Sequence, residues 1–188
     1  MPTRSCLSFL AMILLAAAAN AQTGRRLGSP AARDVFVNGS SDSNFTIADG
    51  GKAAAEIVIP EDAIPSTRAA AKLLKDYFGV MSGASFYITQ GLKDAGKRPK
   101  ILVGFPEKEV GRSEEYLIQA RGTNELVVTG QGTRGTLYGA SALLEYLGCG
   151  FWSRHNETVP VKKTLRVPAG MKRRSAPVFE YRQPLGNP

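Results

Sequence analysis

The sequence predicts an α+β fold: a single mixed, mostly antiparallel sheet with two helices on one face. The sequence contains two stretches with helical periodicity and about six short apolar segments that are bounded like strands. These segments do not alternate one by one with helices, so a doubly wound parallel sheet does not fit their order. About 130 ordered residues are enough to bury a core of their own.

The first ordered segments predict two strands and a helix. Residues 45–48 and 55–59 are apolar bursts that end at turn residues. Apolar residues then recur at every third or fourth position, which predicts a helix over 66–78 with Ser66 as its N-cap and Gly79 as its stop. The predicted buried stripe of this helix is Ala70, Leu73, Leu74, Tyr77 and Phe78.

Four further strands are expected before the second helix. Residues 86–89 and 100–104 should pair with 55–59 in one sheet. Residues 115–120 and 126–129 flank a Gly-Thr-Asn turn, which predicts a β-hairpin.

The second helix is expected over 136–147, because apolar residues recur there at helical spacing and Gly148 follows. A short apolar burst at 151–152 and strand-like segments at 164–167 and 178–182 complete the expected elements.

The N-terminus has the pattern of a secretory signal peptide. Arg4 precedes an apolar run over 7–19, and the run ends in Ala-Asn-Ala. A transmembrane anchor would need about 20 uninterrupted apolar residues. We therefore expect residues 1–21 to direct export to the periplasm or the extracellular space, with no membrane span after cleavage. Residues 22–44 are rich in Gly, Ser, Ala and Arg and are expected to form a flexible leader.

The net charge of +8 comes from 24 Lys+Arg against 16 Asp+Glu in 188 residues. Much of the excess lies between Glu157 and Glu180, a segment without acidic residues. A nucleic-acid surface would interleave basic and aromatic residues, but 158–178 has no aromatic residue. We expect a solvated connector and no nucleic-acid partner. Its basic residues are Lys162, Lys163, Arg166, Lys172, Arg173 and Arg174.

Residues 130–135 read Gly-Gln-Gly-Thr-Arg-Gly, the spacing of a dinucleotide-binding turn between a strand and a helix. No further strand–helix–strand unit follows, and Glu157, the acid near the expected offset, lies in a polar loop. The alternative is a tight turn that brings the start of the helix close to the sheet. The N–H groups at that helix start could still hold an anion such as a carboxylate. No cofactor is predicted.

Nucleophilic and metal chemistry have little support. His155 is the only histidine, and no nucleophile motif accompanies it, so a solvated turn is expected. Cys149 is expected to be a small buried core residue. One histidine and one mature cysteine do not make a metal site, and none is predicted.

Glycoside hydrolysis needs two carboxyl groups that face each other across a cleft. The acidic pairs Glu107/Glu109 and Glu114/Glu115 lie in charged segments and are expected to be solvated. The sequence therefore predicts no catalytic residue.

Several segments resemble the N-terminal module of bacterial α-glucuronidases and the related second domain of β-hexosaminidases. The resemblance covers about residues 50–182 and is most specific in the Arg-Gly-x-x-Tyr-Gly start of the second helix and the Leu-Gly-Cys-x-Phe-Trp that ends it. The other matching segments are 55–63, 66–78, 101–104 and 115–120.

The resemblance implies that residues 45–170 form a hexosaminidase domain-2-like module. Residues 171–188 would then be a basic linker and the start of a catalytic (β/α)8 barrel that is missing from this chain. In hexosaminidases an Arg-Gly pair near the first barrel strand contacts the sugar. Here Arg182 is followed by Gln183, so Arg182 is the single candidate for substrate binding.

On this resemblance, the chain would be the non-catalytic accessory domain of an exported glycoside hydrolase that degrades polysaccharide. Its partners would be the barrel and, in the full-length protein, carbohydrate. The alternative is a stand-alone carbohydrate-binding or scaffold module, which an exposed aromatic platform would favour. The candidate platform residues are Tyr138, Tyr146, Phe151 and Trp152.

Overall fold

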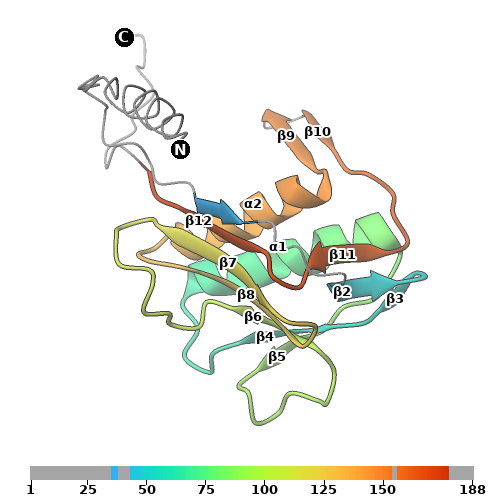
Figure 1. The fold of residues 1–188 in the computed structure, drawn as a ribbon, viewed down its shortest axis with the longest axis horizontal. Coiled ribbons are helices and arrows are strands. Elements are labelled where there is room, and N and C mark those ends of the chain that lie inside the picture. Colours follow the sequence, from blue (N-terminus) through green and yellow to red (C-terminus); the bar gives the residue numbers. More distant parts are fainter. Residues whose placement is uncertain (1–34, 38–42, 154–155, 178–188) are drawn as a thin grey trace, which may run out of the picture. The chain divides into compact units, whose positions relative to one another are not determined.

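The computed structural model describes residues 35–37, 43–153 and 156–177 (Figure 1). Its helices are α1 (Pro65–Ser82) and α2 (Gly135–Leu147). The seven-stranded sheet contains β1 (Val35–Val37), β4 (Glu56–Ile59), β5 (Ile88–Gln90), β6 (Lys100–Val103), β7 (Tyr116–Arg121), β8 (Glu125–Gly130) and β12 (Lys172–Ser175). A three-stranded sheet contains β2 (Asn44–Asp49), β3 (Lys52–Ala53) and β11 (Leu165–Pro168), and β9 (Gly150–Ser153) pairs with β10 (Asn156–Thr158).

The strand order of the large sheet is β1-β12-β7-β8-β6-β4-β5. Strands β5, β4, β6 and β8 run parallel, whereas β7, β12 and β1 continue the sheet with antiparallel pairings. The remaining pairings, in the two smaller sheets, are all antiparallel. The predicted α+β class, with mixed and mostly antiparallel pairing, is confirmed.

The strands nevertheless form three sheets instead of one. β2 is paired on one side with β3 and on the other with β11. Both of its edges are therefore occupied, and β2 cannot also join β4 in the large sheet.

The parallel strands are apolar runs because both faces of the sheet are covered. Ile57, Ile101 and Leu126 belong to a buried cluster shared with both helices. Val58, Leu102 and Val127 form a second buried cluster with Ala95 and Phe105. This alternation places α1 and α2 on one face of the sheet, as Figure 1 also shows. The helix residues of the shared cluster include Leu74, Phe78, Met81, Leu143 and Leu144.

The prediction for α1 was wrong at both ends. The N-cap is Ile64, with no side-chain cap, and Pro65 occupies the first turn, where its fixed φ suits a helix start. The helix continues through Gly79 and ends at Gly83, which has a φ of 76°. Met81 is fully buried, so its burial favours the additional turn over a stop at Gly79. The end of α2 at Gly148 agrees with the prediction.

Parts of the expected leader and linker are strands. Val35–Val37 forms β1, and Lys172–Ser175 forms β12, which lies between β1 and β7. Two basic residues of β12 enter the sheet because Glu109 and Glu115 compensate their charge. The signal peptide over 1–21 and the strand expected at 178–182 lie outside the described residues. No helix among the described residues is long and apolar enough to cross a membrane.

Candidate functional site

The C-terminal half of α1 lies between two exposed aromatic segments. On one side, the ring of Tyr77 contacts Phe151 of β9 edge-on, with ring centroids 5.5 Å apart. The Tyr77 hydroxyl donates a hydrogen bond to Glu157, and this bond raises the pKa of Tyr77 to about 12. On the other side, Val80 of α1 and Tyr87 line one groove.

The β9–β10 hairpin presents an exposed tryptophan. Trp152 is 73% exposed, and a Cβ atom at Gly150 would lie 2.8 Å from its Nε1 atom. The indole N–H also donates to the Thr158 hydroxyl at 3.3 Å. The ring therefore packs against its own hairpin while most of the side chain stays open to solvent. Phe151 is 38% exposed.

The other two residues of the expected aromatic platform, Tyr138 and Tyr146, are half-buried on α2. Tyr146 packs against the core cluster and contacts the ring of Phe36. Of the four predicted platform residues, the exposed ones, Phe151 and Trp152, therefore both lie on the hairpin. We call Phe151, Trp152 and the exposed Val161, which follows the hairpin, the hairpin surface.

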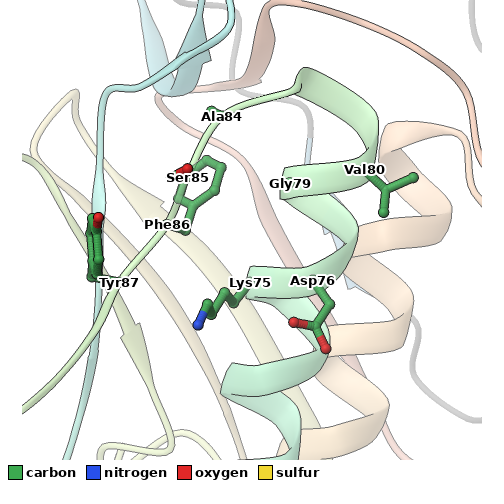
Figure 2. Close-up of a pocket in the computed structure, with 8 residues that line it drawn as sticks. All are labelled: Lys75, Asp76, Gly79, Val80, Ala84, Ser85, Phe86 and Tyr87. Atoms are coloured by element: carbon green, nitrogen blue, oxygen red, sulfur yellow. The ribbon is translucent and has the colours of Figure 1, made fainter.

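A groove of about 600 Å³ separates α1 from residues 84–87, which we call the Tyr87 groove (Figure 2). Lys75, Asp76 and Val80 form its α1 side, and the Tyr87 ring stands opposite them. In Figure 2 the Lys75 side chain extends from the helix toward Tyr87. Ser85 and Tyr87 also line a second hollow of about 350 Å³, so the 73%-exposed Tyr87 ring stands between two hollows.

A third cavity, of about 280 Å³, lies at the carboxyl ends of β4, β6 and β8 and at the starts of both helices. Asp62 and Glu107 line it, and sequence analysis did not identify this pair of acids. The parallel order of the three strands is what creates such a crevice. Asp62 is exposed to solvent, and Glu107 is ion-paired with Arg121 at 2.8 Å. Neither environment is the apolar one that makes a carboxyl group a general acid.

The glycine-rich turn connects β8 to α2 beside this cavity. A Cβ atom at Gly130 would lie 2.1 Å from the carbonyl carbon of Gly135, and one at Gly135 would lie 2.6 Å from the Glu115 carbonyl oxygen. These glycines therefore let strand and helix approach closely. The strand after α2 is β9, which pairs with β10 and not with the large sheet, and Glu157 lies in β10. Within the described residues, α2 is therefore not followed by a strand that returns beside β8, as a dinucleotide-binding turn would require.

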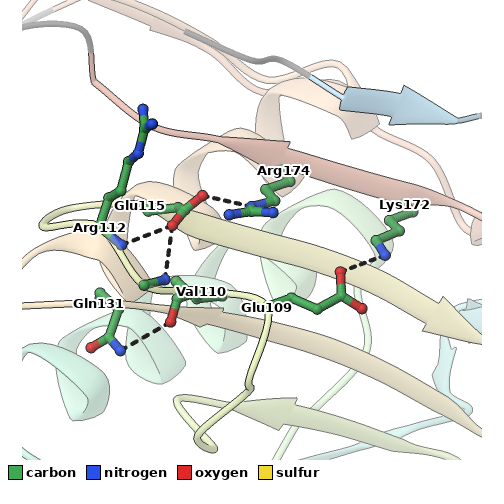
Figure 3. Close-up of polar contacts among 8 residues, drawn as sticks. Glu109, Val110, Arg112, Glu115, Gln131, Lys172 and Arg174 are labelled. Atoms are coloured by element: carbon green, nitrogen blue, oxygen red, sulfur yellow. Dashed lines mark hydrogen bonds and ion pairs between the residues drawn. The ribbon is translucent and has the colours of Figure 1, made fainter.

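Glu115 is 3% exposed, so the prediction that it is solvated was wrong (Figure 3). Its carboxylate accepts hydrogen bonds from the N–H groups of Gly111 and Arg112, both at 2.9 Å, and from Arg174 Nε at 2.5 Å. Burial alone would raise the pKa of Glu115. The hydrogen bond and charge of Arg174 and the two backbone donors outweigh burial and hold this pKa below its usual value.

The other charges of β12 are also engaged. Lys172 pairs with Glu109 at 2.5 Å, and its hydrogen bond holds the pKa of Glu109 below the usual value. Arg173 donates to the Ala142 carbonyl of α2 at 3.4 Å. The interpretation of residues 172–174 as a solvated connector was therefore wrong, because distant acidic residues and a helix carbonyl partner these side chains.

The remaining candidate residues have no site around them. Cys149 is buried with its Sγ 3.6 Å from Met81 Sδ, and burial raises the pKa of its thiol, which fits the predicted core role. His155 and Arg182 lie outside the described residues. Among the residues that the structure describes, no group of three or more His, Cys, Asp or Glu could hold a metal ion.

Comparison with known proteins relates this fold to part of a glycosidase. The structure is similar to that of a family GH115 4-O-methyl-α-glucuronidase, BtGH115A, described as specific for decorated arabinogalactans. The TM-score is 0.56 at 20% sequence identity, over 73% of this chain and 19% of that chain. The chain thus spans about a fifth of the enzyme's length, and the likeness establishes the fold. No family model and no curated protein matches the sequence.

The glycine turn yields a first prediction. Gly130→Ala places a methyl group against the start of α2 and should lower the free energy of unfolding by more than about 3 kcal/mol. Gly111→Ala is the matched control, since its Cβ would meet nothing within 4 Å. It should change stability by less than about 0.5 kcal/mol. Urea unfolding measures both, and equal stability of the two variants would contradict the close-approach role of Gly130.

The ion pair between buried Glu115 and partly exposed Arg174 yields a second prediction. Glu115→Gln should lower the free energy of unfolding by about 2 kcal/mol at pH 7, because it leaves Arg174 without a charged partner. The depressed pKa means that this contribution is present above the usual carboxyl pKa of about 4.3 and is lost as pH falls through the folded-state pKa. The gap between wild type and variant should therefore close in acid.

Glu109→Gln is the control for this measurement, because its ion pair with Lys172 is partly exposed. It should cost less than about 1 kcal/mol at neutral pH. Denaturant unfolding of the three proteins between pH 7 and pH 3 makes the comparison. A Glu115→Gln deficit that stays constant down to pH 3 would show that packing, and not charge, is what the substitution disrupts.

Proposed function

We propose that this chain is the non-catalytic supporting domain of an exported glycoside hydrolase that degrades polysaccharide. The observation that carries the proposal is the structural likeness of most of this chain to a fifth of a glucuronidase chain. A module of that relative size fits an accessory role beside a separate catalytic barrel. In such a barrel, the catalytic residues lie at the ends of several barrel strands.

The acidic side chains of the module support this assignment. Glu115, Glu109 and Glu107 are each ion-paired with a basic residue of the same domain. Glycoside hydrolysis needs one carboxyl group with a raised pKa and a second that faces it. Within the described residues, the pKa values of Glu109 and Glu115 are instead lowered, which suits structural ion pairs better than acid catalysis.

The hairpin surface is a candidate contact site for a neighbouring domain. Phe151, Trp152 and Val161 are exposed apolar side chains on one hairpin and the segment that follows it. Exposed apolar patches on folded domains commonly mark sites of protein contact. We therefore propose that the barrel would contact the hairpin surface.

The exposed Trp152 also favours a second candidate function, a stand-alone carbohydrate-binding module. An indole that packs against its hairpin and stays mostly open to solvent is a suitable platform for a sugar ring. Because Trp152 is the only tryptophan in the sequence, its fluorescence reports on this surface alone. Quenching by neutral polysaccharide fragments would favour this second function, whereas a supporting domain predicts unchanged emission.

The third prediction concerns hydrolysis. The purified chain should release no reducing sugar and no uronic acid from glucuronoxylan or decorated arabinogalactan, because we expect the reactive carboxyl groups in another domain. The assay needs a glucuronidase as positive control and Glu107→Gln as a matched variant. Activity of the chain that Glu107→Gln abolishes would refute the supporting role and would point to the cavity at the strand ends.

A further inference from the structure

We propose that the Tyr87 groove binds an acidic sugar unit, carboxylated or sulfated, of a saccharide chain. The groove is open along α1, and its residues Ser85 and Tyr87 also line the second hollow. An extended ligand could therefore occupy both sides of the ring. The choice of a saccharide among possible anions rests on the proposed function, whereas the site itself rests on the geometry.

The charges around Tyr87 favour an anion. Lys75 in the groove and Lys97 and Arg98 in the second hollow make no ion pair within the described part of the chain. These cations are free to bind a carboxylate or sulfate group, and a guanidinium can do so with two parallel hydrogen bonds.

The acids of the two hollows are mostly engaged. Asp76 is paired with Lys72 at 2.5 Å. Glu56 accepts hydrogen bonds from the Thr89 hydroxyl and from the Gly96 N–H at 3.0 Å. Asp94 is the remaining acid of the second hollow. In the described part of the chain, three basic side chains without an ion pair, Lys75, Lys97 and Arg98, therefore stand against two such acids, Glu56 and Asp94.

The ring itself favours a sugar over other anions. Tyr87 exposes most of its surface although Phe86, next to it, is buried in the core, where it contacts Phe78. The Tyr87 ring offers an apolar face with a polar tip, which matches a pyranose ring with its apolar CH face and its hydroxyl rim. A nucleic acid would require several rings and a longer basic track. The two hollows contain one exposed aromatic ring among their lining residues.

The matched ligands are three versions of one short oligosaccharide. One carries a terminal glucuronic acid, the second carries the same sugar with its carboxyl group reduced to an alcohol, and the third carries a sulfate at that position. Calorimetric titration of the whole chain should show binding of the glucuronic acid or the sulfate version, and about tenfold weaker binding of the reduced one. The stronger of the two acidic ligands identifies the anion.

Three variants locate the site. Tyr87→Ala should weaken binding about tenfold. Lys75→Gln should weaken binding of the acidic ligand about fivefold and leave that of the reduced ligand unchanged. Lys163→Gln removes an exposed positive charge that lines neither hollow, so it is the control and should bind like wild type. All three positions are exposed, so the variants should fold, which circular dichroism checks.

Equal affinity for the acidic and reduced ligands would overturn the proposal, and so would no binding of either acidic ligand. Loss of binding in a fourth variant, Trp152→Ala, instead of Tyr87→Ala would move the site to the hairpin surface. Equally tight binding of a single-stranded oligonucleotide, also weakened by Tyr87→Ala, would replace the saccharide with a general polyanion. None of these outcomes depends on hydrolysis, so failure here is distinct from failure of the proposed function.

Discussion

The carboxylate of Glu115 joins the segments on which the arrangement of this domain depends. It accepts hydrogen bonds from the N–H groups of Gly111 and Arg112 in the loop before β7, and it pairs with Arg174 of β12. The backbone carbonyl of Glu115 accepts a hydrogen bond from the Gln131 N–H in the turn before α2. One buried residue thereby fixes the loop, the position of a basic strand and the start of a helix. Without a compensating carboxylate, Arg174 could not enter a sheet between two other strands at low cost. The cavity at the strand ends is bordered by the same loop and turn, so its shape follows from this interaction.

The local elements of this fold could be predicted because short-range patterns determine them. The period of the apolar residues identifies both helices, and the Gly-Thr-Asn turn identifies the β7–β8 hairpin. The C-terminal end of α1 could not be predicted, because the burial of Met81 depends on distant elements. The role of the basic strand was missed for the same reason. Arg174 and Glu115 are 59 residues apart, and each, taken alone, has the pattern of a solvated charge. The parallel order of β4, β6 and β8 also depends on pairings that no local pattern encodes.

The candidate binding surfaces were predictable only in part. Phe151 and Trp152 were identified as aromatic candidates, but burial divides that set, since Tyr138 and Tyr146 pack on α2. Tyr87 was assigned to a strand over 86–89, but β5 begins at Ile88, and Phe86 is buried in the core whereas Tyr87 is exposed. The glycine-rich turn had two interpretations, and the contact between Gly130 and Gly135 supports the one based on close packing. Sequence spacing alone does not distinguish a turn that binds phosphate from one that lets a helix approach a sheet.

The charges of β12 are paired within this domain, and we propose that a neighbouring domain covers the exposed hairpin surface. The most direct test is hydrogen–deuterium exchange of the chain alone and of the same chain joined to a catalytic barrel. We expect exchange at residues 150–153 and 156–161 to slow by about tenfold or more in the longer protein, because the hairpin surface becomes covered. Exchange in β6 and β8, which are buried in both proteins, should not change. Unchanged exchange at the hairpin would show that the barrel does not cover this surface and would contradict the proposed contact.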